Sequence, residues 1–188
     1  MGRIYFPKPV KLVVSIFGSQ AILLDYYKDL LIKEFGPVDQ ESDIQSFNFT
    51  EYYREEFGNG LIQKLYSFEN LIKPERLSQI KIKTNTLEYI NSDKIKLKNE
   101  NYPDSRKVNI DPGYISLDKF ILASTKNGPA RIYLNNGIYA EITLRFISKS
   151  FVPVESTYSN YKTENFINFL NKIRQLYKLQ LRRYSTQI

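Results

Sequence analysis

Residues 11–18, with the sequence KLVVSIFG, form an apolar and β-branched run that is short enough for a strand buried on both faces. Ser19 follows directly, at the position where a helix N-cap is expected. Gly36-Pro37 then supplies a residue suited to a left-handed C-cap and one that cannot continue a helix. Between these signals apolar residues recur at helical spacing, at Leu23, Tyr27, Leu30 and Leu31. The chain therefore opens with a buried strand and an amphipathic helix.

The next two expected strands are residues 44–49 (IQSFNF) and 61–68 (LIQKLYSF), with a short helix over 50–57 between them. Pro74 suits the first turn of a further helix, whose stripe is Leu77, Ile80, Thr84 and Leu87. Residues 80–86 (IKIKTNT) alternate and would also suit a strand, but the length of the segment and its proline start favour the helix. Residues 108–110 form a fourth strand, which the turn signal Asp111-Pro112-Gly113 is expected to end.

The last third of the chain predicts a short helix, a hairpin and a long helix. The short helix starts at Ser116, ends at Asn127-Gly128 and contains Leu117, Phe120, Ile121 and Ser124. The closing helix covers residues 163–182 and has the apolar stripe Phe166, Leu170, Ile173 and Tyr177. In the hairpin, a three-residue loop with a left-handed Gly137 separates polar from apolar side chains. It pairs Arg131 with Glu141, Ile132 with Ala140, Tyr133 with Tyr139 and Leu134 with Ile138.

The first six elements follow the order βαββαβ of a ferredoxin-like unit, in which helices cover one face of an antiparallel sheet. The sequence thus predicts an α+β fold, with a ferredoxin-like βαββαβ unit extended by a short helix, a β-hairpin and a C-terminal helix. The length of 188 residues, with no internal repeat and no linker, predicts one domain over residues 1–188.

The chain contains no cysteine and no histidine. The first absence excludes disulfides, zinc–thiolate sites, iron–sulfur clusters and cysteine nucleophiles. The second excludes Ser-His-Asp triads and histidine-bearing metal sites, and it removes the usual general base near neutral pH. Carboxylate, lysine, tyrosine and arginine chemistry remain, together with a hard cation such as Mg²⁺ held by oxygen ligands.

The net charge of +7 admits an anionic partner. The longest apolar run, residues 12–17, is far shorter than the roughly 20 residues that cross a bilayer. No signal-peptide pattern follows the N-terminus. We therefore expect no membrane segment and a cytoplasmic protein. Residues 92–107 are polar and lysine-rich, and we expect them to form a mobile, solvated loop.

Several blocks of the chain resemble a bacterial family catalogued as a domain of unknown function. The main blocks are VNIDPGY at 108–114, LDKFILASTKN at 117–127 and RIYLNNGIYAEITLRF at 131–146. Shorter pieces agree with them, namely KPVKL from residue 8, FNFTEYYREEFG at 47–58, SFENLI at 67–72 and TYSNY at 157–161. The resemblance covers nearly the whole chain. It implies a stand-alone bacterial domain and brings no known activity with it.

Candidate ligand-binding residues gather around the DPGY block and the hairpin. An aspartate at a strand end could hold a metal or a ribose hydroxyl, or it could only shape the turn. The polar face of the hairpin, two tyrosines beside a charged pair, suits either a ligand-binding floor or a solvated cross-strand pair. Because only one short element separates the two segments, we expect them to form one pocket wall. The candidates are Asp111, Tyr114, Lys126, Arg131, Tyr133, Tyr139 and Glu141.

The positive charge and the missing catalytic residue types favour a binding module for an anionic small molecule, a nucleotide or RNA. One alternative is a Mg²⁺- or Mn²⁺-dependent enzyme acting on a phosphate ester, in which Lys126 or Arg131 stabilises charge. Its candidate ligands are Asp111, Glu141, Glu51 and Glu55. The third hypothesis is a structural scaffold or oligomer subunit that binds no ligand.

Basic residues one turn apart line the closing helix at Arg174, Lys178 and Arg182. Such a stripe suits RNA or an anionic surface, or it is a solvated face. For a small anion the hairpin is the better site, because an arginine opposite Glu141 is partly oriented before the ligand arrives. We therefore expect Arg131→Ala to reduce anion binding more than Arg182→Ala.

Overall fold

The structure, a computed structural model, describes residues 2–49, 53–89 and 106–185, with only the backbone for residues 54, 55, 184 and 185. The strands are β1 (Val10–Gly18), β2 (Val38–Glu41), β3 (Gln45–Ser46), β4 (Ile62–Ile72), β5 (Val108–Ile115), β6 (Lys119–Ser124), β7 (Arg131–Asn135), β8 (Ile138–Ile147) and β9 (Ser150–Pro153). The helices are α1 (Ala21–Phe35), α2 (Arg54–Phe57), α3 (Leu77–Tyr89) and α4 (Glu164–Ser185), with short 3₁₀ turns η1 (Pro74–Arg76) and η2 (Ser159–Lys162).

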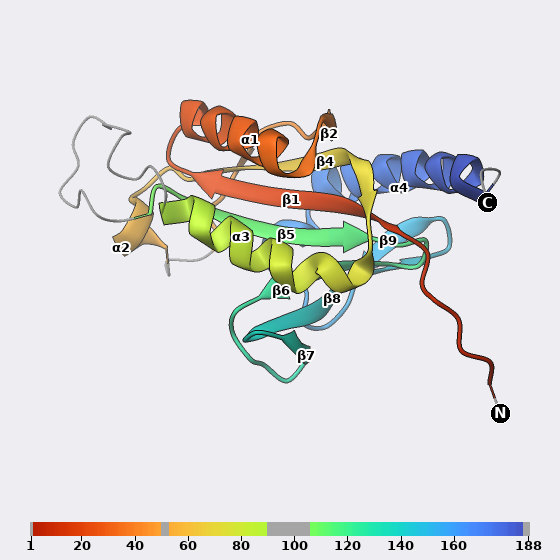
Figure 1. The fold of residues 1–188 in the computed structure, drawn as a ribbon. Helices are drawn as coiled ribbons and strands as arrows, with labels where there is room; N and C mark the ends of the chain where they lie inside the picture. The colour runs from red at the N-terminus through yellow and green to blue at the C-terminus, as the bar shows by residue number, and fades with distance from the viewer. Residues whose placement is uncertain (1, 50–52, 90–105, 186–188) are drawn as a thin grey trace.

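All these strands belong to one sheet with the order β2-β4-β1-β5-β6-β8-β7 (Figure 1), in which β3 also pairs with β4 and β9 with β8. Every pairing is antiparallel. The α+β class and the antiparallel sheet predicted from the sequence are therefore confirmed. The sheet has nine strands, more than a simple ferredoxin-like unit, so the exact ferredoxin-like fold is not confirmed.

Helices cover both faces of the sheet. Leu12, Val14 and Ile16 of β1 pack in one core with α1 and α3. Val13 points the other way, into a second core formed with α4. Strand β1 is therefore buried on both faces, as its mostly apolar and β-branched sequence predicts. Helices α1 and α3 share one face, whereas α4 covers the opposite face and runs behind the sheet in Figure 1.

The prediction of a short helix between Ser116 and Asn127-Gly128 is wrong, because Lys119–Ser124 forms strand β6, which pairs with β5 and β8. Phe120 and Leu122 face the α4 core, while Ile121 and Ala123 face the opposite side. All four side chains are buried. A strand buried on both faces is apolar at every position, so it lacks the alternation that distinguishes a strand from a helix.

The prediction that the fourth strand ends at Asp111-Pro112-Gly113 is wrong. Strand β5 continues through Pro112 and Gly113 to Ile115. Pro112 is tolerated because the pairing with β6 begins only at Gly113, so the first half of β5 has a partner strand on one side alone. At Gly113 the neighbouring strand comes very close, since a Cβ there would lie 2.3 Å from the carbonyl oxygen of Ile121. The Pro-Gly pair marks the place where β6 joins the sheet.

Three of the four residue pairs predicted for the β7–β8 hairpin are confirmed, but the predicted loop length is wrong. Asn135 takes the place of Leu134 opposite Ile138, and the register is irregular just before it. The loop consists of two residues, Asn136 and Gly137, which both have positive φ angles of 51° and 76°. This is the pattern of a type I′ turn, and the irregularity at Leu134 keeps the predicted faces in place.

Helices α1, α3 and α4 occupy the segments predicted to be helical, and the residues of their apolar stripes are buried or half-buried. Gly36 has the predicted positive φ, whereas the N-cap of α1 is Gln20 in place of Ser19. Strands β2 and β9 were not predicted, and β3 is shorter than predicted. Residues 92–105 of the predicted loop lie outside the described residues. Lys107 is buried and Arg106 is half-buried, so the prediction of a solvated loop is wrong for these two residues.

Candidate functional site

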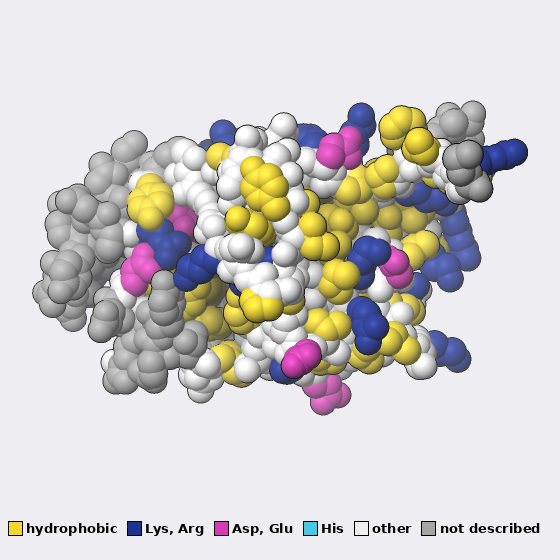
Figure 2. Space-filling model, turned by 90° about the horizontal axis from the view of Figure 1, so that it is seen from below, with side chains coloured by type: hydrophobic (Ala, Val, Ile, Leu, Met, Phe, Trp, Pro, Cys, Tyr) yellow, Lys and Arg dark blue, Asp and Glu magenta, His cyan; other side chains and the backbone are white. Residues whose placement is uncertain are grey.

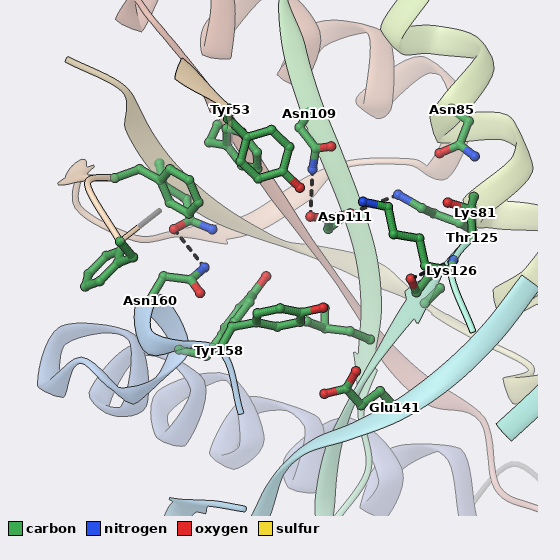
Figure 3. Close-up of a pocket in the computed structure, with 18 of the residues that line it drawn as sticks. Tyr53, Lys81, Asn85, Asn109, Asp111, Thr125, Lys126, Glu141, Tyr158 and Asn160 are labelled. Carbon is green, nitrogen blue, oxygen red and sulfur yellow. Dashed lines mark hydrogen bonds and ion pairs between the residues drawn. The ribbon is translucent and has the colours of Figure 1, made fainter. Parts of the chain in front are cut away.

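A cavity of about 750 Å³ opens beside the first half of β5, where that strand has no partner on the β6 side (Figure 3). Besides β5, its walls include helix α3, the end of β6 with the β6–β7 connection, residues 156–161 before α4, and an aromatic cluster next to the end of β1. Strands β4, β7 and β8 each contribute a residue. The same open edge that allows Pro112 in β5 therefore leaves room for a pocket.

Lys81 of α3 covers the open edge of β5. Its Nζ donates hydrogen bonds to the carbonyl oxygen of Ile110 and to Oδ1 of Asp111, both at 2.9 Å. Nδ2 of Asn109 donates to Oδ2 of Asp111 at 2.7 Å. Both carboxylate oxygens of Asp111 thus have protein partners, which orients this carboxylate in the cavity wall (Figure 3).

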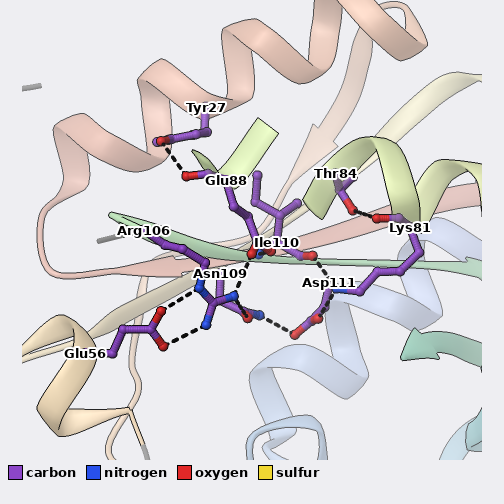
Figure 4. A network of polar contacts seen from close by, with 9 residues as sticks. All are labelled: Tyr27, Glu56, Lys81, Thr84, Glu88, Arg106, Asn109, Ile110 and Asp111. Atoms are coloured by element: carbon purple, nitrogen blue, oxygen red, sulfur yellow. Dashed lines mark hydrogen bonds and ion pairs between the residues drawn. The ribbon is translucent and has the colours of Figure 1, made fainter. Parts of the chain in front are cut away.

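Glu88 and Arg106 extend this network (Figure 4). Oε1 of Glu88 accepts the backbone N–H of Ile110 at 2.7 Å, and Oε2 accepts a hydrogen bond from Arg106 at 2.6 Å. Arg106 also binds both oxygens of Glu56, at 2.6 and 2.7 Å. Burial raises the pKa of Glu88 above its usual value, although Lys81, the Ile110 N–H and Arg106 oppose the shift. Burial alone would lower the pKa of Arg106, but its two carboxylate partners raise it.

Arg131 of β7 forms hydrogen bonds to three residues at the end of the cavity opposite the Glu88–Arg106 network. Its Nε donates to Oε2 of Glu141 at 2.9 Å, Nη1 donates to the carbonyl oxygen of Lys126 at 2.7 Å, and Nη2 donates to the hydroxyl of Tyr158. The side chains of Arg131 and Glu141 are only 11% and 6% exposed. Oε1 of Glu141 is buried and has no hydrogen-bond partner among the described residues.

The end of the cavity nearest to β1 is aromatic. Phe17 stacks on Phe47 with ring centroids 4.4 Å apart, and Tyr53 meets Phe17 edge-on at 4.7 Å. Phe49 lies next to Phe47, with centroids 6.0 Å apart, and remains 40% exposed. The cavity thus combines aromatic rings near β1 with charged groups in the rest of its wall.

Comparison with family models matches residues 8–177 to the family described as Domain of unknown function (DUF4416). The chain belongs to the DUF4416 family. The family membership predicted from the sequence is confirmed, and the matched range includes every cavity residue described above. Neither the curated proteins nor the solved structures contain a match to the chain. The function of this DUF4416 domain therefore has to be argued from its site.

The cavity of the DUF4416 domain brings together four of the predicted ligand-binding residues: Asp111, Lys126, Arg131 and Glu141. Glu141 pairs with Leu122 of β6, which in turn pairs with Gly113 of β5. Side chains two residues apart on a strand share a face, so Asp111 and Glu141 lie on the same face of the sheet. Asp111, Arg131 and Glu141 therefore line one cavity, as expected, whereas Tyr114 does not, and a role of these residues in ligand binding stays a prediction.

The other predicted residues lie elsewhere. Tyr114 points to the opposite face, where it packs against the α1–α3 core and beside Ile121. Because β5 continues without a turn, the residue three positions after Asp111 must face the other side. Tyr133 and Tyr139 pair edge-to-face, with centroids 5.4 Å apart, but they do not line the cavity.

No three candidate metal ligands lie together in the part of the chain that the structure describes. Asp111 is engaged with Lys81 and Asn109, and Glu141 with Arg131. Glu51 lies outside the described residues, and only the backbone of Glu55 is described. A Mg²⁺ site that uses these two residues stays a prediction.

The basic stripe of α4 is partly used in packing. Nε of Arg174 donates to the carbonyl oxygen of Leu117 at 2.7 Å, and the guanidinium lies 3.4 Å from the ring centroid of Phe146. Lys178 and Arg182 are exposed. Figure 2 shows basic side chains near the end of the molecule that holds the C-terminus. RNA binding stays a prediction. None of the helices described, α4 included, has the length and apolar character needed to cross a membrane.

The prediction from the sequence missed four residues whose hydrogen bonds hold the centre of the site: Lys81, Glu88, Arg106 and Asn109. A signal exists for two of them, because Lys81, Thr84 and Glu88 recur at helical spacing and all three are buried on α3. Arg106 gave no signal, since it ends a long polar stretch. Asn109 was missed because a turn was expected at Asp111. Only a strand that continues through Asp111 places the two side chains on one face.

Proposed function

We propose that this DUF4416 domain binds a small molecule of the nucleoside or nucleotide class in the cavity beside β5. The observation that carries the proposal is the combination, in one cavity, of an aromatic wall, a row of ordered amide and carboxylate groups, and lysine and arginine side chains. A volume of about 750 Å³ lies within the range of small-molecule sites.

The aromatic end suits a planar heterocycle. Phe47 is held by its stack on Phe17, whereas Phe49 is apolar and yet 40% exposed beside the cavity. Stacking of a base on an aromatic side chain contributes about 1–3 kcal/mol and tolerates every base. A base placed there would also cover part of the exposed Phe49 ring.

The middle of the cavity suits hydroxyl groups such as those of a ribose. The Asp111 carboxylate accepts hydrogen bonds from Lys81 and Asn109, and each of its oxygens can accept a further one. Asn160 lies across the cavity, where it donates to Oε1 of Gln63 at 3.1 Å. Because these contacts form without a ligand, little side-chain freedom is lost on binding.

The charges of the cavity wall support an anionic group on the ligand. Among the described residues, the cavity wall contains four cationic side chains and three carboxylates. The cations are Lys81, Arg106, Lys126 and Arg131, and the carboxylates are Glu88, Asp111 and Glu141. Lys126 is exposed, and its side chain extends from the β6–β7 connection toward Asp111 (Figure 3). A phosphate next to Lys126 would add a charge-assisted contact.

Thermal unfolding with ATP, GTP, CTP and UTP tests this proposal, because a ligand that binds the folded state raises the unfolding midpoint. Phe49→Ala should weaken binding about tenfold, as expected for the loss of a stacking contact. Ile82→Ala is the control, since Ile82 is equally exposed at 40% but does not line the cavity. A midpoint unchanged by all four nucleotides, or equal effects of the two variants, would contradict the proposal.

A further inference from the structure

Among the described residues of the cavity wall, two buried polar atoms have no hydrogen-bond partner: Oε1 of Glu141 and the hydroxyl of Tyr161. Glu141 lines the cavity and is 5% exposed, yet this oxygen has no hydrogen-bond partner among the described residues. A buried carboxylate oxygen without a donor is costly, because the group has lost water and gained nothing in return. An acceptor of this kind in a cavity wall indicates a donor on the molecule that binds there.

The orientation of this carboxylate is set by its neighbours. Oε2 accepts a hydrogen bond from Arg131, which is itself held by the carbonyl oxygen of Lys126 and the hydroxyl of Tyr158. Oε1 therefore cannot turn toward another partner without breaking the pair with Arg131. Thr143, the nearby hydroxyl, donates to the backbone carbonyl of Glu141 and leaves the carboxylate alone.

Tyr158 is the exposed member of this group, with 49% of its surface accessible. It lines the cavity beside Glu141, and Figure 3 shows the two side chains facing the same space. A ligand can therefore reach the Glu141–Arg131 pair by displacing a single surface side chain, without movement of the sheet.

We propose that Oε1 of Glu141 accepts a hydrogen bond from a nitrogen donor on the ligand. If the base stacks on Phe49, the donor is an amine at the other end of the ligand. If the ligand binds in the reverse orientation, the donor is the exocyclic amino group of the base. A carboxylate only accepts, and its negative charge favours an N–H donor and repels a phosphate oxygen. This inference rests on the proposed function and names the group that a nucleoside-class ligand presents at the β7–β8 end of the cavity.

Isothermal titration calorimetry with matched ligand pairs tests the inference. ATP against ITP and CTP against UTP compare an amino with a keto group on the base, and 5′-amino-5′-deoxyadenosine against adenosine compares an amine with a hydroxyl at the tail. The wild-type protein should prefer the amino member of at least one pair by about tenfold or more, the effect of one hydrogen bond to a charged group. The type of pair that responds identifies the source of the amine.

Glu141→Gln is the decisive variant, because it keeps an acceptor for Arg131 and can place an NH₂ donor where Oε1 stood. It should abolish or reverse the amino preference. Glu155→Gln, at an exposed glutamate that does not line the cavity, should retain it. Circular dichroism and unfolding midpoints establish that both variants are folded, and the wild-type preferences do not depend on either variant.

The outcomes separate the two proposals. If nucleotides bind without an amino preference, or if Glu141→Gln keeps the preference, the role of Glu141 is overturned and the proposed function stands. If no nucleotide or nucleoside binds, the proposed function fails. Tyramine and 4-ethylphenol, a ring with and without an amine, then test Glu141 in the same way. A tyramine preference that Glu141→Gln removes supports its role, and equal binding or no binding overturns it.

Discussion

Lys81 Nζ lies 2.9 Å from Oδ1 of Asp111 and 2.9 Å from the carbonyl oxygen of Ile110. Seven residues later on the same helix, Glu88 accepts the N–H of Ile110. Two side chains of α3 thus satisfy both backbone groups of one residue at the open edge of β5, a task that a neighbouring strand performs elsewhere in the sheet. The same lysine orients the Asp111 carboxylate in the cavity, so this contact serves both the fold and the site.

Lys81→Met should lower the free energy of unfolding by about 2–3 kcal/mol, because it leaves the Ile110 carbonyl without its Lys81 donor and removes the cation that pairs with the Asp111 carboxylate. Asp111 is 31% exposed, so the loss should stay below that of a fully buried pair. Lys83→Met is the matched control on the same helix. Lys83 is 45% exposed and pairs with Glu34, and its loss should be below about 1 kcal/mol. Equal losses in urea unfolding would show that the β5 edge does not depend on Lys81.

Gly113→Ala should destabilise the protein by about 3 kcal/mol, because the added Cβ would lie 2.3 Å from the Ile121 carbonyl oxygen and force β5 and β6 apart. Gly137→Ala has no atom within 4 Å of the new Cβ and only strains a positive φ of 76°, which costs about 1 kcal/mol. Urea unfolding of both variants checks the contrast. A smaller loss for Gly113→Ala than for Gly137→Ala would contradict the close approach of these strands.

The raised pKa of Glu88 predicts a pH dependence of stability. The folded protein holds this proton more tightly than the unfolded chain, in which glutamate titrates near 4.5. The stability contributed by Glu88 is therefore complete below pH 4.5 and is lost as the pH rises through the higher folded pKa. Relative to Glu88→Gln, the wild type should lose free energy of unfolding as the pH rises above about 4.5. Urea unfolding across this range checks it, with the exposed Glu69→Gln as a control that should follow the wild type. A difference between wild type and Glu88→Gln that does not change with pH would refute the raised pKa.

The sequence predicts the helices of this fold well and its strands unevenly. Helices α1, α3 and α4 carry one apolar stripe each, and that pattern has a single interpretation. Strand β6 is apolar on both faces, so its sequence is compatible with a helix. The Asp111-Pro112-Gly113 sequence has the composition of a turn, and only the position of β6 shows why these residues suit a continuous strand.

The candidate site is predictable to the extent that its residues lie close in sequence. The hairpin register placed Arg131 opposite Glu141, and the structure has the same pair. Asn109 meets Asp111 because the two residues share a face of the same strand, β5. Lys81 meets Asp111 only because α3 packs across the edge of β5, a long-range contact that no local pattern encodes. Such contacts depend on the tertiary arrangement and appear only with the structure.

Calorimetric titration of ATP, GTP, CTP and UTP into the wild type and into Asn85→Trp is the most direct test of the central claim, that the cavity beside β5 binds a nucleotide. Asn85 lines the cavity from α3 and is half-buried, so a tryptophan there would occupy part of the space. Gln79→Trp, at an exposed position of α3 that does not line the cavity, is the control. We expect at least one nucleotide to bind the wild type and Gln79→Trp with the same affinity and to lose binding to Asn85→Trp. Binding that is equal in all three proteins, or absent from the wild type, would contradict the account.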